Sequence, residues 1–179
     1  MNDLILLANL LDGPKHGYEL KRVAGLIFGT PELHNNFVYP MLHRFQKSGW
    51  VSRTSTAGKR GQTRFQYALT RKGKQELLQR AAEYPDGKDC TREGFYVRVA
   101  LLPMLGLEAR QKILRAEESE LEALLERFAR IQRAIDAPFF GLQVIRFLER
   151  RTRMELAWVR ELRRQALHDL PPAPVEDWE

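Results

Sequence analysis

The stretch that decides the fold reads Asn35-Asn36-Phe37-Val38-Tyr39-Pro40-Met41-Leu42-His43-Arg44-Phe45-Gln46-Lys47-Ser48-Gly49-Trp50. Its apolar residues recur at helical spacing and predict one buried stripe, made of Val38, Met41, Leu42 and Phe45. The opposite side is rich in hydrogen-bonding groups and carries Asn36, Tyr39, His43 and Lys47. Asn35 or Asn36 is suited to cap such a helix and Gly49 to end it, and an Asn36 cap would leave Pro40 in the first turn. We therefore predict a short helix over residues 36–48 with a core-facing back and a polar front.

Two more short helices are expected before this one. Asp3 is placed to cap the first, in which Leu4, Leu7, Ala8 and Leu11 form the buried stripe. The second runs from about residue 16 to residue 28 and is ended by Gly29-Thr30-Pro31. Three short helices with tight connections predict a helix-turn-helix arrangement.

A β-hairpin is expected directly after the third helix. Residues 50–55 and 64–69 read as strands, and the second places Phe65, Tyr67 and Leu69 on one face. The turn between them carries Lys59 and Arg60. This pattern fits either a plain solvent-facing hairpin or the wing of a winged helix, and its position after three helices favours a wing over residues 53–69. Thr70 is then placed to cap a further helix over residues 71–83.

The second half of the chain is predicted to be helical throughout. Residues 85–90 read as a linker that separates a winged-helix domain over residues 1–84 from a helical domain over residues 91–170, and residues 171–179 form a tail. Helices over about 108–136 and 139–168 would form an antiparallel hairpin whose apolar stripes need a partner. A second copy of the chain is the simplest partner, and a monomer whose helices fold back on the first domain is the alternative. The expected dimerisation residues are Leu121, Leu125, Phe128, Leu148, Val159 and Leu162. The fold class is therefore mainly α with a small β-wing.

Charge is divided unevenly between the two halves. Residues 1–84 carry 13 Lys and Arg against 6 Asp and Glu, whereas residues 85–179 carry 16 against 17. A basic first half is expected if that half meets a polyanion. The single cysteine, Cys90, excludes an internal disulfide framework and fits a reducing compartment. The apolar run from residue 4 to residue 11 is too short to span a bilayer, so we expect a cytoplasmic protein without a membrane partner.

Four motifs in order resemble the PadR family of transcriptional regulators. They are His16-Gly17-Tyr18-Glu19-Leu20, Tyr39-Pro40-Met41-Leu42, Gly49-Trp50-Val51 and Tyr67-Ala68-Leu69-Thr70-Arg71-Lys72-Gly73. The C-terminal half is similar to the subfamily with a long helical dimerisation domain, through Glu93-Gly94-Phe95 and Ala157-Trp158-Val159-Arg160-Glu161-Leu162. The resemblance implies a bacterial regulator, usually a repressor, that binds a palindromic operator as a homodimer.

Double-stranded DNA is therefore the expected partner. A helix of this size fits the major groove, where Asn36, Tyr39, His43 and Arg44 would reach base edges or phosphates. The wing cations Lys59, Arg60 and Arg64 would meet the backbone or the minor groove, and Lys47 would add phosphate attraction. For Tyr39 the alternative is a ring packed against the wing, and for His43 it is a bare surface histidine.

Two competing function classes have less support. An enzyme is disfavoured because the sequence has no Gly-rich phosphate loop, HExxH, CxxC or nucleophile elbow. We expect no cofactor and no metal, although His34 and His43 would be the residues to test for one. A winged helix that binds protein instead of DNA has no need of so basic a half. Phe139, Phe140, Phe147, Trp158 and Trp178 are candidates either for plain core or for the lining of a small-molecule effector pocket.

Overall fold

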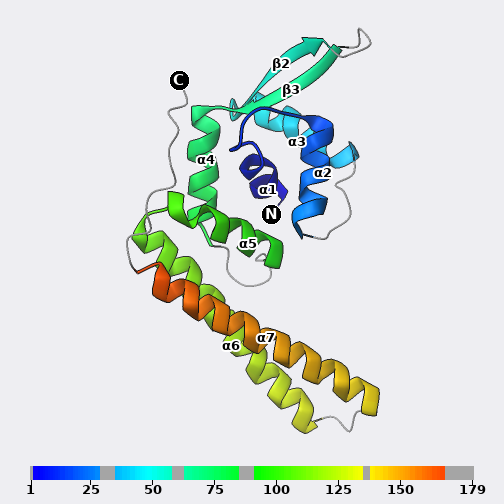
Figure 1. Cartoon of the computed structure of the whole chain (residues 1–179), viewed down its shortest axis with the longest axis vertical. Helices are drawn as coiled ribbons and strands as arrows, with labels where there is room; N and C mark the ends of the chain where they lie inside the picture. The colour runs from blue at the N-terminus through cyan, green and yellow to red at the C-terminus, as the bar shows by residue number, and fades with distance from the viewer. Residues whose placement is uncertain (1, 29–34, 58–62, 85–90, 135–137, 168–179) are drawn as a thin grey trace. The chain divides into compact units, whose positions relative to one another are not determined.

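The chain is mainly helical with a small β-sheet, as predicted, and the sheet has three strands (Figure 1). The computed structural model describes residues 2–28, 35–57, 63–84, 91–134 and 138–167. Its contacts divide the chain into two compact units. The first holds α1 (Asn2–Ala8), β1 (Lys15–His16), α2 (Gly17–Phe28), α3 (Asn35–Lys47), β2 (Val51–Ala57), β3 (Thr63–Leu69), α4 (Arg71–Ala82) and α5 (Arg92–Leu101). The second holds η2 (Leu102–Met104), α6 (Leu107–Ala134) and α7 (Phe139–Gln165).

The helices of the first unit surround α1. A single buried stripe was predicted for α1, but Leu4, Ile5, Leu6 and Leu7 are all buried, whereas Ala8 and Leu11 are only half-buried. An apolar run without an exposed face is typical of a helix enclosed on all sides. The predicted stripe of α3 is confirmed, since Val38, Met41, Leu42 and Phe45 are buried. Leu20 of α2 and Leu77 of α4 are also fully buried.

The sheet has the strand order β1-β3-β2 and is antiparallel throughout. The two longer strands form the predicted hairpin, with Val51 opposite Leu69 and Ala57 opposite Thr63. β1 was not predicted, because two residues show no alternation of their own. It exists through its partner, with Lys15 opposite Tyr67 and His16 opposite Gln66.

The boundary between the two compact units falls after α5, whereas the predicted helical domain begins at residue 91. α5 contacts α1 and belongs to the first unit. Phe95 and Leu101 of α5 are buried, and the Arg98 side chain donates to the backbone carbonyl of Arg80 in α4 at 3.5 Å. The predicted linker 85–90 and tail 171–179 lie outside the described residues.

The second unit is an antiparallel hairpin in which α6 and α7 run side by side (Figure 1). At 1.5 Å per residue, helices of 28 and 27 residues are each about 40 Å long. Leu121, Leu156 and Val159 are buried between them. Ion pairs add to the contact, since Glu118 of α6 meets Arg160 at 2.8 Å and Arg163 at 2.6 Å.

Candidate nucleic-acid interface

The exposed face of α3 carries three of the side chains predicted to contact DNA. Tyr39, His43 and Lys47 are all exposed, while the opposite stripe is buried. Gln46, three residues after His43, is also exposed, and it was not predicted because it lies outside the row formed by these three residues. Asn36 lies in α3, but its side chain is outside what the structure describes. The helix therefore presents a continuous polar surface of amide, imidazole, phenol and ammonium groups.

The start of α3 departs from the prediction. Neither Asn35 nor Asn36 is a flanking cap, because the helix already includes both, and Pro40 therefore lies inside the helix at its sixth residue. A proline there has no N–H to donate to the carbonyl of Asn36. Pro40 is exposed, so the side of the helix with this carbonyl faces away from the core.

Each edge of the α3 surface is held by a neighbouring element. On one edge the Tyr39 ring lies against Gly17 at the start of α2, where an added Cβ would come within 2.7 Å of its Cε1. Burial raises the pKa of Tyr67 on β3, the Arg53 charge lowers it and Tyr39 raises it. Tyr39 is 45% exposed, so its contact with Gly17 leaves much of the ring at the surface.

On the other edge, Arg44 is turned toward α1. Its guanidinium donates to Asp3 at 2.6 Å, and Asp3 also lies 3.5 Å from Arg80. The same guanidinium lies 5.6 Å from the centre of the Phe45 ring. Arg44, which was predicted to reach DNA, is thus paired with an acidic side chain of the same chain. Its partner is 41 residues away in the chain, so no local pattern could reveal the pair.

The end of α3 is closed by the predicted glycine. Gly49 has a φ of +73°, its N–H donates to the carbonyl of Gln46 at 3.0 Å, and the N–H of Trp50 donates to that of Phe45 at 2.9 Å. This is a Schellman motif, completed by the contact of the Phe45 and Trp50 rings at 5.5 Å.

The same corner is tied to α4 through Thr70. Its hydroxyl donates to the carbonyl of Gly49 at 2.7 Å and accepts from the N–H of Gly73 at 3.0 Å, which confirms the predicted cap. The position of α3 is thereby linked to the strand that leads into α4.

The wing has two chemically different faces, because residues alternate along a strand. The inner face, continuous with the core, carries Val51, Arg53 and Ser55 of β2 and Phe65, Tyr67 and Leu69 of β3. The outer face carries Arg64 opposite Thr56, and Arg64 is exposed as predicted. Lys59 and Arg60 lie outside the described residues. Arg53 is exposed on the inner face, opposite Tyr67.

Comparison with known families identifies this unit. Residues 6–79 match the model of the transcriptional regulator PadR-like family. Residues 6–79 form a PadR-like regulator domain. No curated protein matches the chain.

Three solved structures are similar to this chain. A Bacillus subtilis PadR structure in complex with operator DNA is 16% identical, with 92% of this chain and 98% of that chain covered and a TM-score of 0.46. The same regulator in complex with p-coumaric acid is 17% identical, with coverages of 93% and 98% and a TM-score of 0.41. A Thermoplasma acidophilum protein is 29% identical over 44% of this chain and 74% of its own, with a TM-score of 0.41.

The first motif of the PadR-like domain has a physical explanation in this fold. His16 pairs in β1, and its Nδ1 lies 3.1 Å from the carbonyl oxygen of Phe65 on β3. Glu19 accepts from the N–H of His16 at 2.7 Å, which caps the start of α2. Gly17 leaves room for Tyr39, and the exposed Tyr18 ring stacks on His16 at 5.7 Å. The motif thus joins α2, the wing and α3.

Neither a membrane span nor a metal site was found in the described parts of the chain. No helix there is long and apolar enough to cross a bilayer. No group of three or more potential His, Cys, Asp or Glu ligands occurs among the described residues. His34, one of the two histidines considered for a metal, lies outside them.

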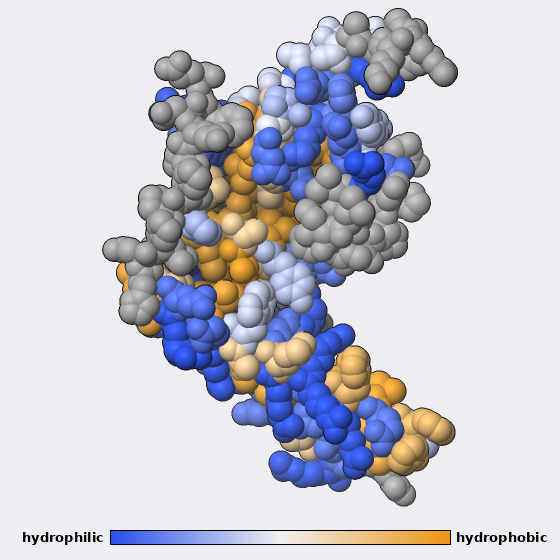
Figure 2. All heavy atoms as spheres, viewed as in Figure 1, coloured by the Kyte–Doolittle hydropathy of each residue, from blue (hydrophilic) through white to orange (hydrophobic). Residues whose placement is uncertain are grey.

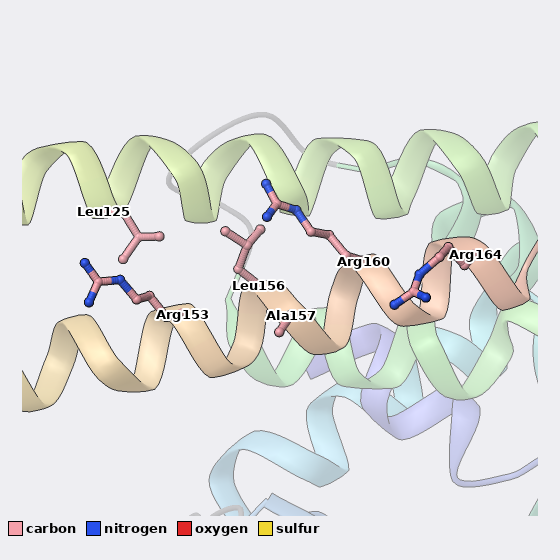
Figure 3. Close-up of a pocket in the computed structure, with 6 residues that line it drawn as sticks. All are labelled: Leu125, Arg153, Leu156, Ala157, Arg160 and Arg164. Carbon is pink, nitrogen blue, oxygen red and sulfur yellow. The ribbon is translucent and has the colours of Figure 1, made fainter.

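A second family model matches α5 together with the helical unit. Residues 91–166 correspond to the model described as virulence activator alpha C-term. A groove of about 470 Å³ lies between α6 and α7, lined by Leu125, Arg153, Leu156, Ala157, Arg160 and Arg164 (Figure 3). Each of its arginines already meets a glutamate: Arg153 pairs with Glu149, Arg160 with Glu118 and Glu122, and Arg164 with Glu161. Hydrogen bonds to Glu118 and then Glu122 raise the pKa of Arg160.

The aromatic residues considered for an effector pocket do not line this groove. Phe139, Phe140, Phe147 and Trp158 are instead exposed on α7, and Trp178 lies outside the described residues.

Proposed function

We propose that this chain is a sequence-specific regulator of transcription, most simply a repressor, that binds a palindromic operator in double-stranded DNA as a homodimer. The helix over residues 36–48 enters the major groove, and the wing over residues 53–69 follows the backbone or the minor groove. Transcriptional regulation is the function named by the family of residues 6–79.

The observation that carries the proposal is the exposed face of α3. It is polar, it is backed by a fully buried stripe, and both of its edges and its C-terminal end are fixed to neighbouring elements. A rigid helix with exposed His43, Gln46 and Lys47 offers donors and acceptors to base edges and a cation to phosphates. The net charge of +7 over residues 1–84 supports a polyanionic partner (13 basic against 6 acidic residues).

A dimer is proposed because one winged helix reads too few base pairs for a unique site. Two copies held together can read half-sites about 34–36 Å apart, one turn of the duplex. The surface that would hold them differs from the predicted one. Leu121 and Val159 are already buried between α6 and α7, and Leu125, Phe128, Leu148 and Leu162 are half-buried there.

The exposed apolar residues lie on another face of α7, which we call the α7 seam. It consists of Phe140, Val144, Phe147, Met154 and Trp158. Their spacing of four, three, seven and four residues is the a/d spacing of a coiled coil, with Arg151 at the remaining position. Figure 2 shows hydrophobic residues gathered on the helical hairpin near its turn. This seam is the proposed contact with a second copy.

We also propose that the chain binds a small-molecule effector. The arginine-lined groove between α6 and α7 is the site to test first, since its floor is apolar and its rim carries donors for a carboxylate (Figure 3). An incoming anion would have to compete with the glutamates that already pair with these arginines.

The proposal is tested by selecting binding sites from a random double-stranded DNA library with the whole protein. Enrichment of an inverted repeat is expected. Asn36→Ala and His43→Ala should then lower affinity for the selected site more than for random DNA, by about 1–3 kcal/mol for each hydrogen-bonded base that the shortened side chain no longer reaches.

A protein-binding winged helix would give a different result. It would enrich no sequence, and the same substitutions would leave the weak, salt-sensitive attraction to DNA unchanged. Equal decreases in affinity for selected and random DNA would instead show that Asn36 and His43 contact only the sugar-phosphate backbone.

A further inference from the structure

The inner face of the wing carries an arginine stacked on an aromatic ring. The guanidinium carbon of Arg53 lies 3.4 Å from the centre of the Phe65 ring. The pair is diagonal in the sheet, because Arg53 is opposite Tyr67 and Phe65 is opposite Ser55. Both side chains are exposed, with Phe65 at 40%, so the stack lies at the surface and not in the core.

Stacking leaves the N–H donors of the Arg53 guanidinium available to bind a ligand. The Phe65 ring occupies one face of the guanidinium plane, while the N–H donors point outward from its edge. No carboxylate partner of Arg53 is found among the described residues, whereas Arg44 meets Asp3 and Arg80 meets Asp3 and Glu76. Among the described residues, Arg53 is thus a cation whose side-chain conformation is fixed in advance and whose charge no carboxylate neutralises.

The strand that carries Arg53 lies beside the helix proposed to read bases, since α3 and β2 contact each other. On the inner face of the wing Arg53 is opposite Tyr67. The backbone of the neighbouring strand is fixed as well, since the carbonyl oxygen of Phe65 lies 3.1 Å from His16 Nδ1 in β1. The stack therefore lies on a strand pair next to α3, and its β3 strand is paired on both edges.

We propose that Arg53, held flat against Phe65, binds a phosphate of the DNA backbone next to the groove occupied by α3. A planar guanidinium with two parallel N–H groups matches two phosphate oxygens, and the stack removes the entropy cost of fixing a long side chain. This contact lies on the inner face of the wing near its base, apart from the tip. It rests on the proposed function, because it requires DNA at α3.

The test compares charge and shape at one position by measuring affinity for a selected site across a range of salt concentrations. Arg53→Gln should lower the salt slope of log K by about 0.9, the value for one phosphate contact, together with a decrease in affinity. Arg53→Lys should keep nearly the wild-type slope but bind several-fold more weakly, because the charge remains and the planar fork does not. Phe65→Leu should behave like Arg53→Lys, because it removes only the ring that orients the guanidinium.

Arg115→Gln is the matched control, since it removes one exposed arginine from α6 in the other unit. If Arg53→Gln changes binding no more than Arg115→Gln does, the proposal is overturned. It is also overturned if Arg53→Gln weakens binding with an unchanged slope, because Arg53 then acts only through the fold. If a Phe65→Leu protein binds DNA like wild type, the stack does not contribute to binding. A wild-type protein with no salt-dependent binding to DNA contradicts the proposed function itself, and the Arg53 contact with it.

Discussion

Gly17 and Gly73 both lie where an added Cβ would collide, but with different kinds of atom. At Gly73 the Cβ would come within 2.0 Å of the carbonyl oxygen of Trp50, which is backbone. At Gly17 it would come within 2.7 Å of the Tyr39 ring, which is a partly exposed side chain able to rotate. The two substitutions should therefore separate stability from recognition.

Gly73→Ala should destabilise the protein by about 3 kcal/mol or more, because neither α4 nor the Trp50 carbonyl can move alone. Urea unfolding measures the change. Gly106→Ala is the control, since nothing lies within 4 Å of its added Cβ, and it should change stability by less than about 1 kcal/mol. Similar decreases in stability for the two variants would show that α4 can shift away from Trp50.

Gly17→Ala should instead change stability by less than about 1 kcal/mol while moving the Tyr39 ring off its position. If Tyr39 contacts DNA, affinity for the selected site falls. The same substitution in a Tyr39→Ala background should then have no further effect on binding, because the ring it displaces is already absent. Additive effects on affinity in the double variant would mean that Gly17 acts without Tyr39.

At the scale of elements, local patterns predicted the helices and strands that organise the first unit. The apolar period of α3, its Gly49 stop, the hairpin and the Thr70 cap were all present within a few neighbouring residues, and all are confirmed. The features that were not predicted depend on distant partners. β1 exists only as a neighbour of β3, α5 is placed by contacts with α1, and Arg44 is held by Asp3.

The link between α3 and α4 yields a further prediction. Thr70→Val removes a hydroxyl that accepts from the N–H of Gly73 and donates to the carbonyl of Gly49, and should cost about 1–2 kcal/mol. Thr54→Val on the exposed part of β2 makes the same chemical change and should stay within about 0.5 kcal/mol. Thermal unfolding of the two variants compares them directly, and equal melting temperatures would contradict the capping role of Thr70.

At the scale of the whole molecule, the α7 seam predicts how the chain assembles. Phe147→Glu places a charge on an exposed residue of the seam, and it should give a folded monomer that binds a palindromic site weakly. Leu121→Glu buries a charge between α6 and α7, so it should unfold the helical unit instead. Sedimentation and circular dichroism distinguish the two outcomes. A wild-type protein that sediments as a 20.8 kDa monomer would contradict the dimer.

The sequence predicted the candidate site only in part, because some of its features depend on how the whole chain folds. Exposure of Tyr39, His43 and Lys47 follows from helix periodicity, which a sequence displays. The stacking of Arg53 on Phe65 follows from the register of two strands. Whether an arginine is left without an acidic partner depends on which carboxylates fold near it, as Asp3 does near Arg44. These are properties of the folded chain.

The glutamate–arginine pairs of α6 and α7 affect how much of the protein in a cell is bound to non-specific DNA. A genome offers about 10⁶–10⁹ non-specific sites, and each uncompensated cation increases the fraction of a regulator held on them. The second half of this chain carries 16 basic residues, enough to adsorb it to any DNA, but 17 acidic residues accompany them. Glu118, Glu122, Glu149 and Glu161 hold four of these arginines in ion pairs. Neutralisation within the helical unit thus limits binding to non-specific DNA, and the recognition of a specific site is left to the winged helix.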